Sequence, residues 1–240
     1  MSVDGAVWGD LFAPLRDGEA WVVGQLGQSV DGRIATGSGH SHYINGPDDI
    51  ERLHRLRALA DAVVVGAGTV ASDDPRLTVR LCEGESPVRV VLDSSARCDA
   101  GSTVFQDGAA RTLWVQAQDV PGTEATVRAG GDAPAPHVDV ERLPTFDGRF
   151  DPHAIVRLLA DRGLTRVLVE GGGLTVSGFL QAKALNRLHL SVAPLILGSG
   201  RPSLTLPPIE TLDEALRPRV RHFTLGSDLL FDLDFGSSDA

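Results

Sequence analysis

The chain has 240 residues, of which 42% are hydrophobic and 22% charged, and its formal net charge is −10. This length suffices for one large domain with a substantial core, or for two small ones. An acidic chain without a basic run argues against nucleic acid or an anionic membrane as a partner. No run approaches the ~18 apolar residues of a membrane span, and residues 1–10 lack the pattern of a secretory signal. Cys82 and Cys98 show no C-x-x-C spacing and favour reduced thiols in a cytoplasmic protein, with a disulfide between the two as the alternative.

The first quarter of the chain predicts an arm, a strand, a long loop and a helix. We expect residues 1–19 to form an irregular N-terminal arm and residues 20–26 the first strand. Residues 27–46 are rich in Gly, Ser and His, which predicts a long loop. Residues 47–59 begin with Pro and acidic residues and repeat apolar side chains at helical spacing, so they predict an amphipathic helix. Arg57 lies beside the apolar stripe, and periodicity alone favours a solvated position for it.

Residues 63–80 combine a buried strand with side chains suited to an anion. An apolar β-branched run opens the stretch, and two glycines then let the backbone turn sharply. Thr69 can cap a helical turn or donate to a phosphate. Two aspartates precede Pro75, which ends any helix there, and Arg80 supplies a fork of donors. The stretch is either a ligand-binding edge of an α/β sheet or an ordinary strand-turn-helix connection.

The rest of the chain alternates strands and helices. Strands are predicted over residues 88–92, 112–115, 166–170, 186–192, 220–225 and 229–235, with a shorter one reached through residues 134–140. A helix begins at Asp151-Pro152 and ends at Gly163, and residues 121–136 predict a surface excursion. The last two strands form a hairpin. We therefore expect one α/β domain over residues 20–240, with a mixed, mostly parallel central sheet flanked by helices and a C-terminal antiparallel hairpin.

A glycine cluster follows the strand that ends at Glu170. Gly171, Gly172 and Gly173 lead into a helix, an arrangement that points backbone N–H groups at an anion or allows close helix-sheet packing. Glu170 must be solvated, hydrogen-bonded or paired, because a lone carboxylate is costly to bury. The histidines lack metal-ligand spacing, and neither a zinc-deaminase signature nor a nucleophile elbow is present. The remaining groups suit a protein that positions a cofactor.

Longer runs carry a family resemblance. Gly-x-Gly-Thr-Val at residues 66–70 is followed by Asp-Asp-Pro-x-Leu-Thr-x-Arg at residues 73–80, a specific combination. Shorter matching runs are found at residues 27–35, 41–47, 56–57, 91–94, 170–173, 193–194 and 197–198. From about Trp21 onward the chain resembles the pyrimidine reductase family of riboflavin biosynthesis. This family is the reductase half of a bifunctional deaminase-reductase, with a dihydrofolate-reductase-like fold, and the resemblance here is to a stand-alone form.

The resemblance implies NADPH as cofactor and a ribosylaminopyrimidine 5′-phosphate as substrate. The family chemistry transfers a hydride to C1′ of the ring-opened ribose and gives a ribitylamino product. By matching position, the cofactor site would be lined by Gly27, Tyr43, Thr69, Asp73, Ser94, Gly172, Gly173, Leu174, Thr175, Val176, Ser177 and Gly178. The substrate site would be lined by Ser41, Arg57, Leu77, Arg80 and Glu170.

Roles for three of these residues follow from the same resemblance. Arg57 and Arg80 would hold the 5′-phosphate through charge-assisted hydrogen bonds. Glu170 is the candidate catalytic residue, orienting the substrate or helping to deliver a proton. Since family members are often dimers, the resemblance also implies a homodimer.

Two positions depart from the family pattern. Gln25 stands where the bifunctional enzymes usually carry Lys, and Tyr43 where they usually carry Trp. A neutral amide cannot replace an ammonium group facing a pyrimidine carbonyl at equal strength. Two alternatives therefore stay open, an NADPH-dependent reductase of a pterin or other small heterocycle and a non-catalytic nucleotide-binding relic. The pair Arg57 and Arg80 favours the phosphorylated substrate, because a pterin ring carries no phosphate.

Overall fold

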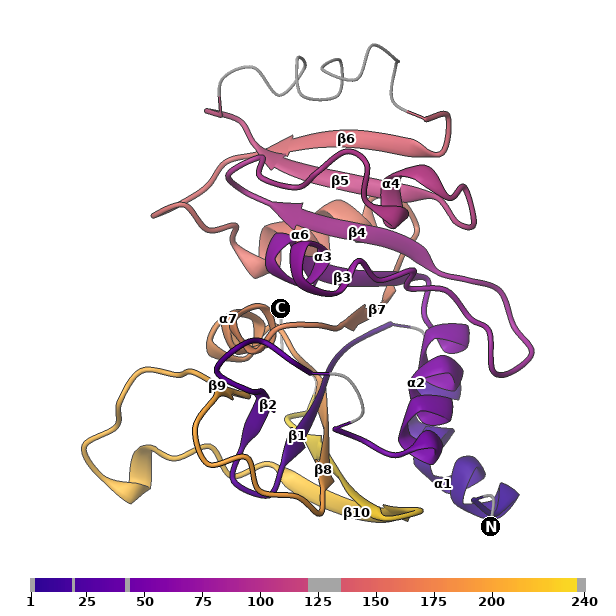
Figure 1. Cartoon of the computed structure of the whole chain (residues 1–240), viewed down its shortest axis with the longest axis vertical. Coiled ribbons are helices and arrows are strands. Elements are labelled where there is room, and N and C mark those ends of the chain that lie inside the picture. The colour runs from indigo at the N-terminus through magenta and orange to yellow at the C-terminus, as the bar shows by residue number, and fades with distance from the viewer. Residues whose placement is uncertain (1–2, 19, 42–43, 121–134, 237–240) are drawn as a thin grey trace. The chain divides into compact units, whose positions relative to one another are not determined.

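The computed structural model describes residues 3–18, 20–41, 44–120 and 135–236. The chain divides into two compact units, the first made of residues 1–53 and 172–240 and the second of residues 54–171. The boundary falls within helix α2 (Pro47–Leu59). Figure 1 labels the elements of both units. The prediction of one domain over residues 20–240 stays a prediction.

The first unit contains a four-stranded sheet in the order β10-β11-β8-β1. Its elements are α1 (Gly5–Arg16), β1 (Trp21–Ser29), β2 (Arg33–Ala35), α7 (Gly173–Gln181), β8 (Arg187–Ala193), β9 (Arg201–Pro202), the 3-10 helix η1 (Leu212–Glu214), β10 (Arg219–Leu225) and β11 (Asp228–Asp234). Strands β1 and β8 are parallel, whereas β11 pairs antiparallel with both β8 and β10. The predicted C-terminal hairpin is therefore confirmed.

The prediction of an irregular arm over residues 1–19 was wrong, because α1 occupies most of it. Asp4 accepts a hydrogen bond from the backbone N–H of Ala6 and caps the helix. The apolar residues follow the i, i+3, i+4, i+7 spacing of one helix face and are buried, namely Trp8, Leu11, Phe12 and Leu15. That spacing was visible in the sequence, although Pro14 in the last turn obscured the helical pattern. The predicted loop over residues 27–46 also contains strand β2.

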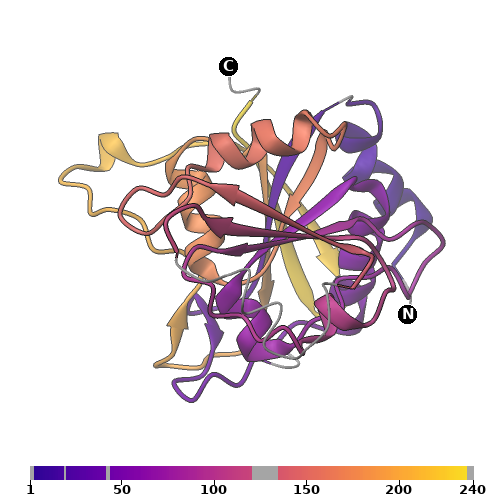
Figure 2. The same cartoon turned by 90° about the horizontal axis from the view of Figure 1, so that it is seen from above.

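The second unit is built on a five-stranded parallel sheet in the order β7-β3-β4-β5-β6. Besides the end of α2, its elements are β3 (Ala62–Gly66), α3 (Ala67–Asp73), β4 (Val88–Asp93), α4 (Thr103–Gln106), β5 (Thr112–Ala117), β6 (Val138–Leu143), α6 (Pro152–Ala160) and β7 (Arg166–Val169). Figures 1 and 2 show α3 and α4 on one face of this sheet and α6 on the other.

Helices on both faces explain the composition of these strands. A strand covered on both faces is an almost continuous apolar run rather than an alternating one. Val63, Val64 and Val65 of β3 are each fully buried, and Trp114 of β5 stacks on Phe105 with ring centroids 4.3 Å apart. The predicted strands of this unit match within one to three residues, whereas α4 was not predicted. Most of the predicted surface excursion, residues 121–134, lies outside the described residues.

Candidate functional site

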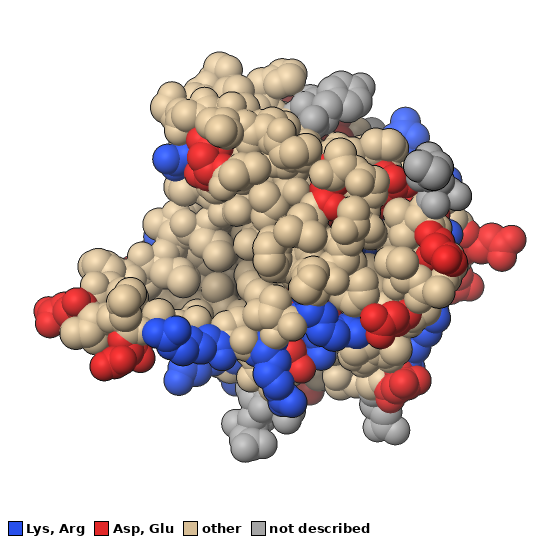
Figure 3. All heavy atoms as spheres, turned by 90° about the horizontal axis from the view of Figure 1, so that it is seen from below, with Lys and Arg blue, Asp and Glu red and all other residues tan. Residues whose placement is uncertain are grey.

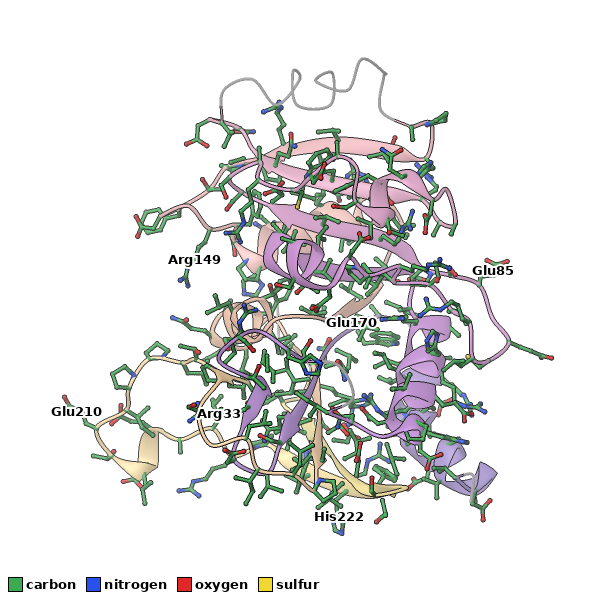
Figure 4. The ribbon with its side chains drawn as sticks, in the orientation of Figure 1. Arg33, Glu85, Arg149, Glu170, Glu210 and His222 are labelled. Carbon is green, nitrogen blue, oxygen red and sulfur yellow. The ribbon has the colours of Figure 1, made fainter. Side chains whose placement is uncertain are left out.

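The second unit holds a buried ion pair at the carboxyl end of β7. Glu170, labelled in Figure 4, directly follows that strand, and its backbone N–H donates to the carbonyl oxygen of Val64 at 2.8 Å. Nε of Arg57 donates to Oε1 of Glu170 at 2.8 Å, and NH2 donates to Oε2 at 2.7 Å. The Arg57 and Glu170 side chains are only 8% and 6% exposed. Of the states predicted for Glu170, the fold therefore adopts the ion pair, with hydrogen bonds to the same partner.

This pair corrects the prediction from periodicity that Arg57 is solvated. Burial lowers the pKa of Arg57, but the charge and hydrogen bonds of Glu170 outweigh burial, so its pKa is raised. Helical periodicity treats a polar residue as solvent-facing because it contains no information on a distant counter-ion. The counter-ion here is 113 residues away along the chain. The family resemblance was the signal that identified this position.

The segment before Arg80 has an unusual backbone. Residues 74–80 belong to neither a helix nor a strand. Leu77 is 2% exposed and has a φ of +57°, a left-handed conformation that is unfavourable for a bulky side chain. NH1 of Arg57 donates to the carbonyl oxygen of Thr78 at 3.2 Å, so the buried ion pair also holds this segment. The structure therefore brings together four of the predicted substrate-site residues, Arg57, Leu77, Arg80 and Glu170.

Arg80 places its guanidinium in a positive environment. Its NH1 group donates to Oγ1 of Thr78 at 2.7 Å, while the residue as a whole is exposed. Partial burial, and then the guanidinium groups of Arg57 and Arg76, lower the pKa of Arg80. Three guanidinium groups and the single carboxylate of Glu170 leave two positive charges. A dianionic phosphate would neutralise them.

His54 was not predicted as a site residue. It lies one turn before Arg57 on α2, is 3% exposed, and its Nδ1 accepts the backbone N–H of Arg80 at 3.0 Å. Burial, and then the charges of Arg57 and Arg80, lower the pKa of His54 to about 4. The imidazole is therefore neutral near pH 7, with its proton on Nε2. The sequence offered one indication of this role, because His54 lies three residues before Arg57 and therefore on the same face of the helix.

The predicted cofactor residues of the second unit lie at the carboxyl ends of its strands. Thr69 lies in the first turns of α3 against Gly171, where an added Cβ would meet its side chain. Asp73 is exposed at the end of the same helix, and Ser94 follows β4 and is half-buried. In an open α/β sheet, these strand ends are where ligands bind.

A buried aspartate shapes the turn that carries Ser94. Asp93 is fully buried and accepts backbone N–H groups from Arg97 at 2.9 Å and Cys98 at 3.0 Å. It also accepts Nε1–H of Trp114 at 3.2 Å. Asp93 was not predicted as a functional residue, and its role here is to hold the turn.

The first unit contains the other predicted cofactor residues and Ser41. Gly27, at the end of β1, has Asn45 so close to its backbone that a Cβ would collide with the amide oxygen. Nδ2 of Asn45 in turn donates to Ser191 and to Asp228, each at 3.1 Å. Ser41 is half-buried in the following loop. The prediction for Tyr43 lies outside the described residues.

Residues 172–178 form the N-cap and the start of α7, and some of them are packed against neighbouring segments while others are accessible. Val176 is fully buried and lies against Gly24 of β1, and Oγ of Ser177 accepts the backbone N–H of Thr205 at 2.8 Å. Gly173 is buried against the backbone of residues 202–203. The more accessible positions of this run are Gly172, Leu174, Thr175 and Gly178. Close packing is therefore shown for Gly173, and anion binding at the more accessible positions stays a prediction.

Gln25 lies in a polar layer of the first unit. In the β1–β8 register it stands opposite His189, a fully buried histidine that accepts from NH1 of Arg52 through Nδ1 at 3.3 Å. Asp232, on the neighbouring strand β11, accepts through Oδ1 from NH1 of Arg187 at 2.7 Å.

The surface carries both signs of charge. The face in Figure 3 shows Lys and Arg beside Asp and Glu, so the net negative charge of the chain does not preclude a local basic site.

Within the described residues, no helix is long and apolar enough to cross a bilayer. The same residues contain no group of three His, Cys, Asp or Glu side chains arranged to hold a metal ion.

The parallel strands of the second unit and the antiparallel C-terminal strands of the first define an α/β protein. The family model described as the RibD C-terminal domain matches residues 20–231, and the chain belongs to that family. The resemblance found in the sequence is thereby confirmed.

Three relatives illustrate the range of this similarity. The chain is 34% identical to the 2,5-diamino-6-ribosylamino-4(3H)-pyrimidinone 5′-phosphate reductase of Methanothermobacter thermautotrophicus, over 88% of this chain and 96% of that protein. It is 35% identical to the riboflavin biosynthesis protein RibD of Chlamydia pneumoniae, over 74% of this chain but 47% of that protein. A Thermotoga maritima deaminase/5-amino-6-(5-phosphoribosylamino)uracil reductase superimposes with a TM-score of 0.72 at 27% identity, over 90% of this chain and 56% of that one.

Proposed function

We propose that this chain is an NADPH-dependent reductase of riboflavin biosynthesis. Its substrate would be 5-amino-6-(5-phosphoribosylamino)uracil or the 2,5-diamino analogue, reduced at the ribosyl group to the ribitylamino product. Family membership over residues 20–231 supports the reaction class. The relative matched over 96% of its length is named for the 2,5-diamino substrate. The observation that carries the proposal is the net charge of two on the group formed by Arg57, Arg76, Arg80 and Glu170, because it fits a phosphorylated substrate.

The residues present fit a dinucleotide cofactor. Gly68, in the first turn of α3, has the Arg97 guanidinium beside it, with NH2 3.7 Å from the position of an added Cβ. An open glycine turn next to a cation suits the phosphates of such a cofactor. Thr69, Asp73 and Ser94 are the residues of the second unit that would hold it. For Gly27, Tyr43 and residues 172–178 of the first unit, cofactor binding stays a prediction from the family resemblance. When bound, the cofactor supplies the hydride.

The chain's own residues would bind and orient the substrate. Arg80 would donate to the 5′-phosphate, and the Arg57 guanidinium would contribute to the positive charge around it. Both oxygens of Glu170 already accept from Arg57, so we infer that Glu170 acts mainly by orienting this guanidinium. Leu77 would complete this part of the substrate site, and the role of Ser41 in the first unit stays a prediction from the family resemblance.

The test is NADPH consumption with the phosphorylated pyrimidine and with a dihydropterin, by the wild type and Arg80→Ala. Losing a charge-assisted hydrogen bond to phosphate should raise KM for the pyrimidine ~10- to 100-fold. Arg219→Ala, at an exposed arginine of β10, is the matched control and should leave KM unchanged. Equal turnover of the pterin by the wild type and Arg80→Ala would favour a pterin reductase. Tight NADPH binding without any turnover would favour a non-catalytic relic.

Rescue of a riboflavin auxotroph lacking its reductase tests the same proposal in cells.

We also propose that the protein is a cytoplasmic homodimer. The support is the family resemblance and the absence of a disulfide from Cys82 and Cys98 in the described part of the chain. Light scattering during gel filtration would contradict the dimer if it gave the mass of a single chain.

A further inference from the structure

Two side chains of α2, one turn apart, hold the segment that ends at Arg80. Nδ1 of His54 accepts the backbone N–H of Arg80 at 3.0 Å. NH1 of Arg57 donates to the carbonyl oxygen of Thr78 at 3.2 Å. Since residues three apart share one helix face, both contacts come from the same side of α2. The segment is thereby held at two points two residues apart.

The held segment depends on side chains for its conformation. Leu77 is buried with a φ of +57°, which a leucine adopts only where its surroundings impose it. Two residues later, the backbone N–H of Val79 donates to Oγ of Ser86 at 3.1 Å. The backbone of residues 77–80 is therefore set by contacts from His54, Arg57 and Ser86.

Arg80 is fixed at both ends. His54 binds its backbone N–H, and Thr78 accepts from its guanidinium through Oγ1 at 2.7 Å. An exposed arginine side chain has many rotamers, and holding it in one geometry lowers the entropic cost of binding an anion.

We propose that His54 is a positioning residue of the substrate-phosphate site, whose neutral imidazole holds the Arg80 backbone so that the guanidinium faces the phosphate. This inference rests on the proposed function. His54 does not touch the substrate in this account and acts through Arg80 alone. The substrate class concerned is a phosphate monoester.

The charged groups around His54 keep it neutral. Arg57 on α2 and Arg80 on the held segment oppose its protonation, and Glu170 at the end of β7 favours it. A protonated imidazole cannot accept at Nδ1, so Arg80 would be released as His54 is protonated. With the pKa of His54 lowered to about 4, this release is confined to acidic solution.

The test compares His54→Leu, which removes the acceptor, with His54→Asn, whose side-chain oxygen can accept in place of Nδ1 and does not titrate. His54→Leu should raise KM for the phosphorylated pyrimidine about tenfold, while kcat and KM for NADPH stay within about twofold. His54→Asn should restore most of that loss. Below about pH 5 the wild type should lose affinity relative to His54→Asn, which separates His54 from titration of the substrate phosphate.

The experiment distinguishes a failure of the His54 inference from a failure of the proposed function. Wild-type turnover with an unchanged KM in folded His54→Leu would overturn this inference and leave the proposed function standing. So would equal effects of His54→Leu and His54→Asn, because the acceptor would then be irrelevant. If His54→Leu does not fold, the pH comparison of the wild type with His54→Asn decides, and parallel pH profiles overturn the inference. A wild type with no turnover overturns both proposals.

Discussion

The pair of Arg57 and Glu170 joins two buried, oppositely charged side chains that lie far apart in the sequence. Both side chains are buried, and each carboxylate oxygen of Glu170 accepts one short hydrogen bond from Arg57. A buried charge pair adds little over a well-packed apolar pair, but removing one partner leaves a charge without compensation. The same guanidinium also reaches Thr78, so the pair connects α2 to the Arg80 segment.

We predict that Arg57→Leu lowers the free energy of unfolding by about 3 to 5 kcal/mol, because Glu170 is left as an uncompensated buried charge. The double variant Arg57→Leu/Glu170→Leu should recover most of this loss. Urea unfolding at neutral pH measures both. Arg111 and Asp139 form a matched surface pair, 2.7 Å apart and 73% and 57% exposed. Arg111→Leu should cost less than about 1 kcal/mol, and equal losses at Arg57 and Arg111 would contradict the argument.

At the scale of elements, α7 shows why a glycine cluster cannot be interpreted from sequence alone. Gly173 lies against the backbone carbonyls of Pro202 and Ser203, so its lack of a side chain serves packing. Gly178, five residues later in the same helix, has nothing within 4 Å of an added Cβ. The sequence predicted the helix but not which glycine faces a neighbour, because that depends on a segment about 30 residues later.

We predict opposite effects of the same substitution at these two glycines. Gly173→Ala should destabilise the protein by about 1 to 3 kcal/mol or more, because the methyl group meets backbone that cannot rotate away. Gly178→Ala should stabilise it by about 0.5 to 1 kcal/mol through the higher helix propensity of alanine. Thermal unfolding monitored by circular dichroism compares the two. A stabilised Gly173→Ala variant would show that the close contact with residues 202–203 is wrong.

At the scale of the whole molecule, buried neutral histidines link stability to pH. Burial lowers the pKa of His54 to about 4 and also lowers the pKa of His189. In the unfolded chain both histidines have a pKa near 6.5, so between about pH 6.5 and 4 the unfolded state binds more protons. Stability is therefore highest above pH 6.5 and falls as the solution is acidified through this range.

We predict that the histidine at position 54 alone accounts for about 2 kcal/mol of lost stability between pH 7.5 and pH 5. His54→Asn should remove this part, so its unfolding free energy should vary less with pH than that of the wild type. Urea unfolding at the two pH values provides the comparison. His222, which is exposed on β10, is the control, and His222→Asn should leave the pH dependence unchanged. Identical pH slopes for the wild type and His54→Asn would contradict the prediction.

The sequence by itself determined the family and most of the succession of strands and helices, although α1, α4 and β2 were not predicted. Apolar runs, helix caps and the run from Gly66 to Arg80 are local patterns, and local patterns are what a sequence displays directly. The tertiary structure alone decided that Arg57 is buried against Glu170, that His54 holds Arg80, and that residues 5–16 bury an apolar helix face. Partner choice and burial depend on segments far apart in the chain, which are brought together only when the core forms.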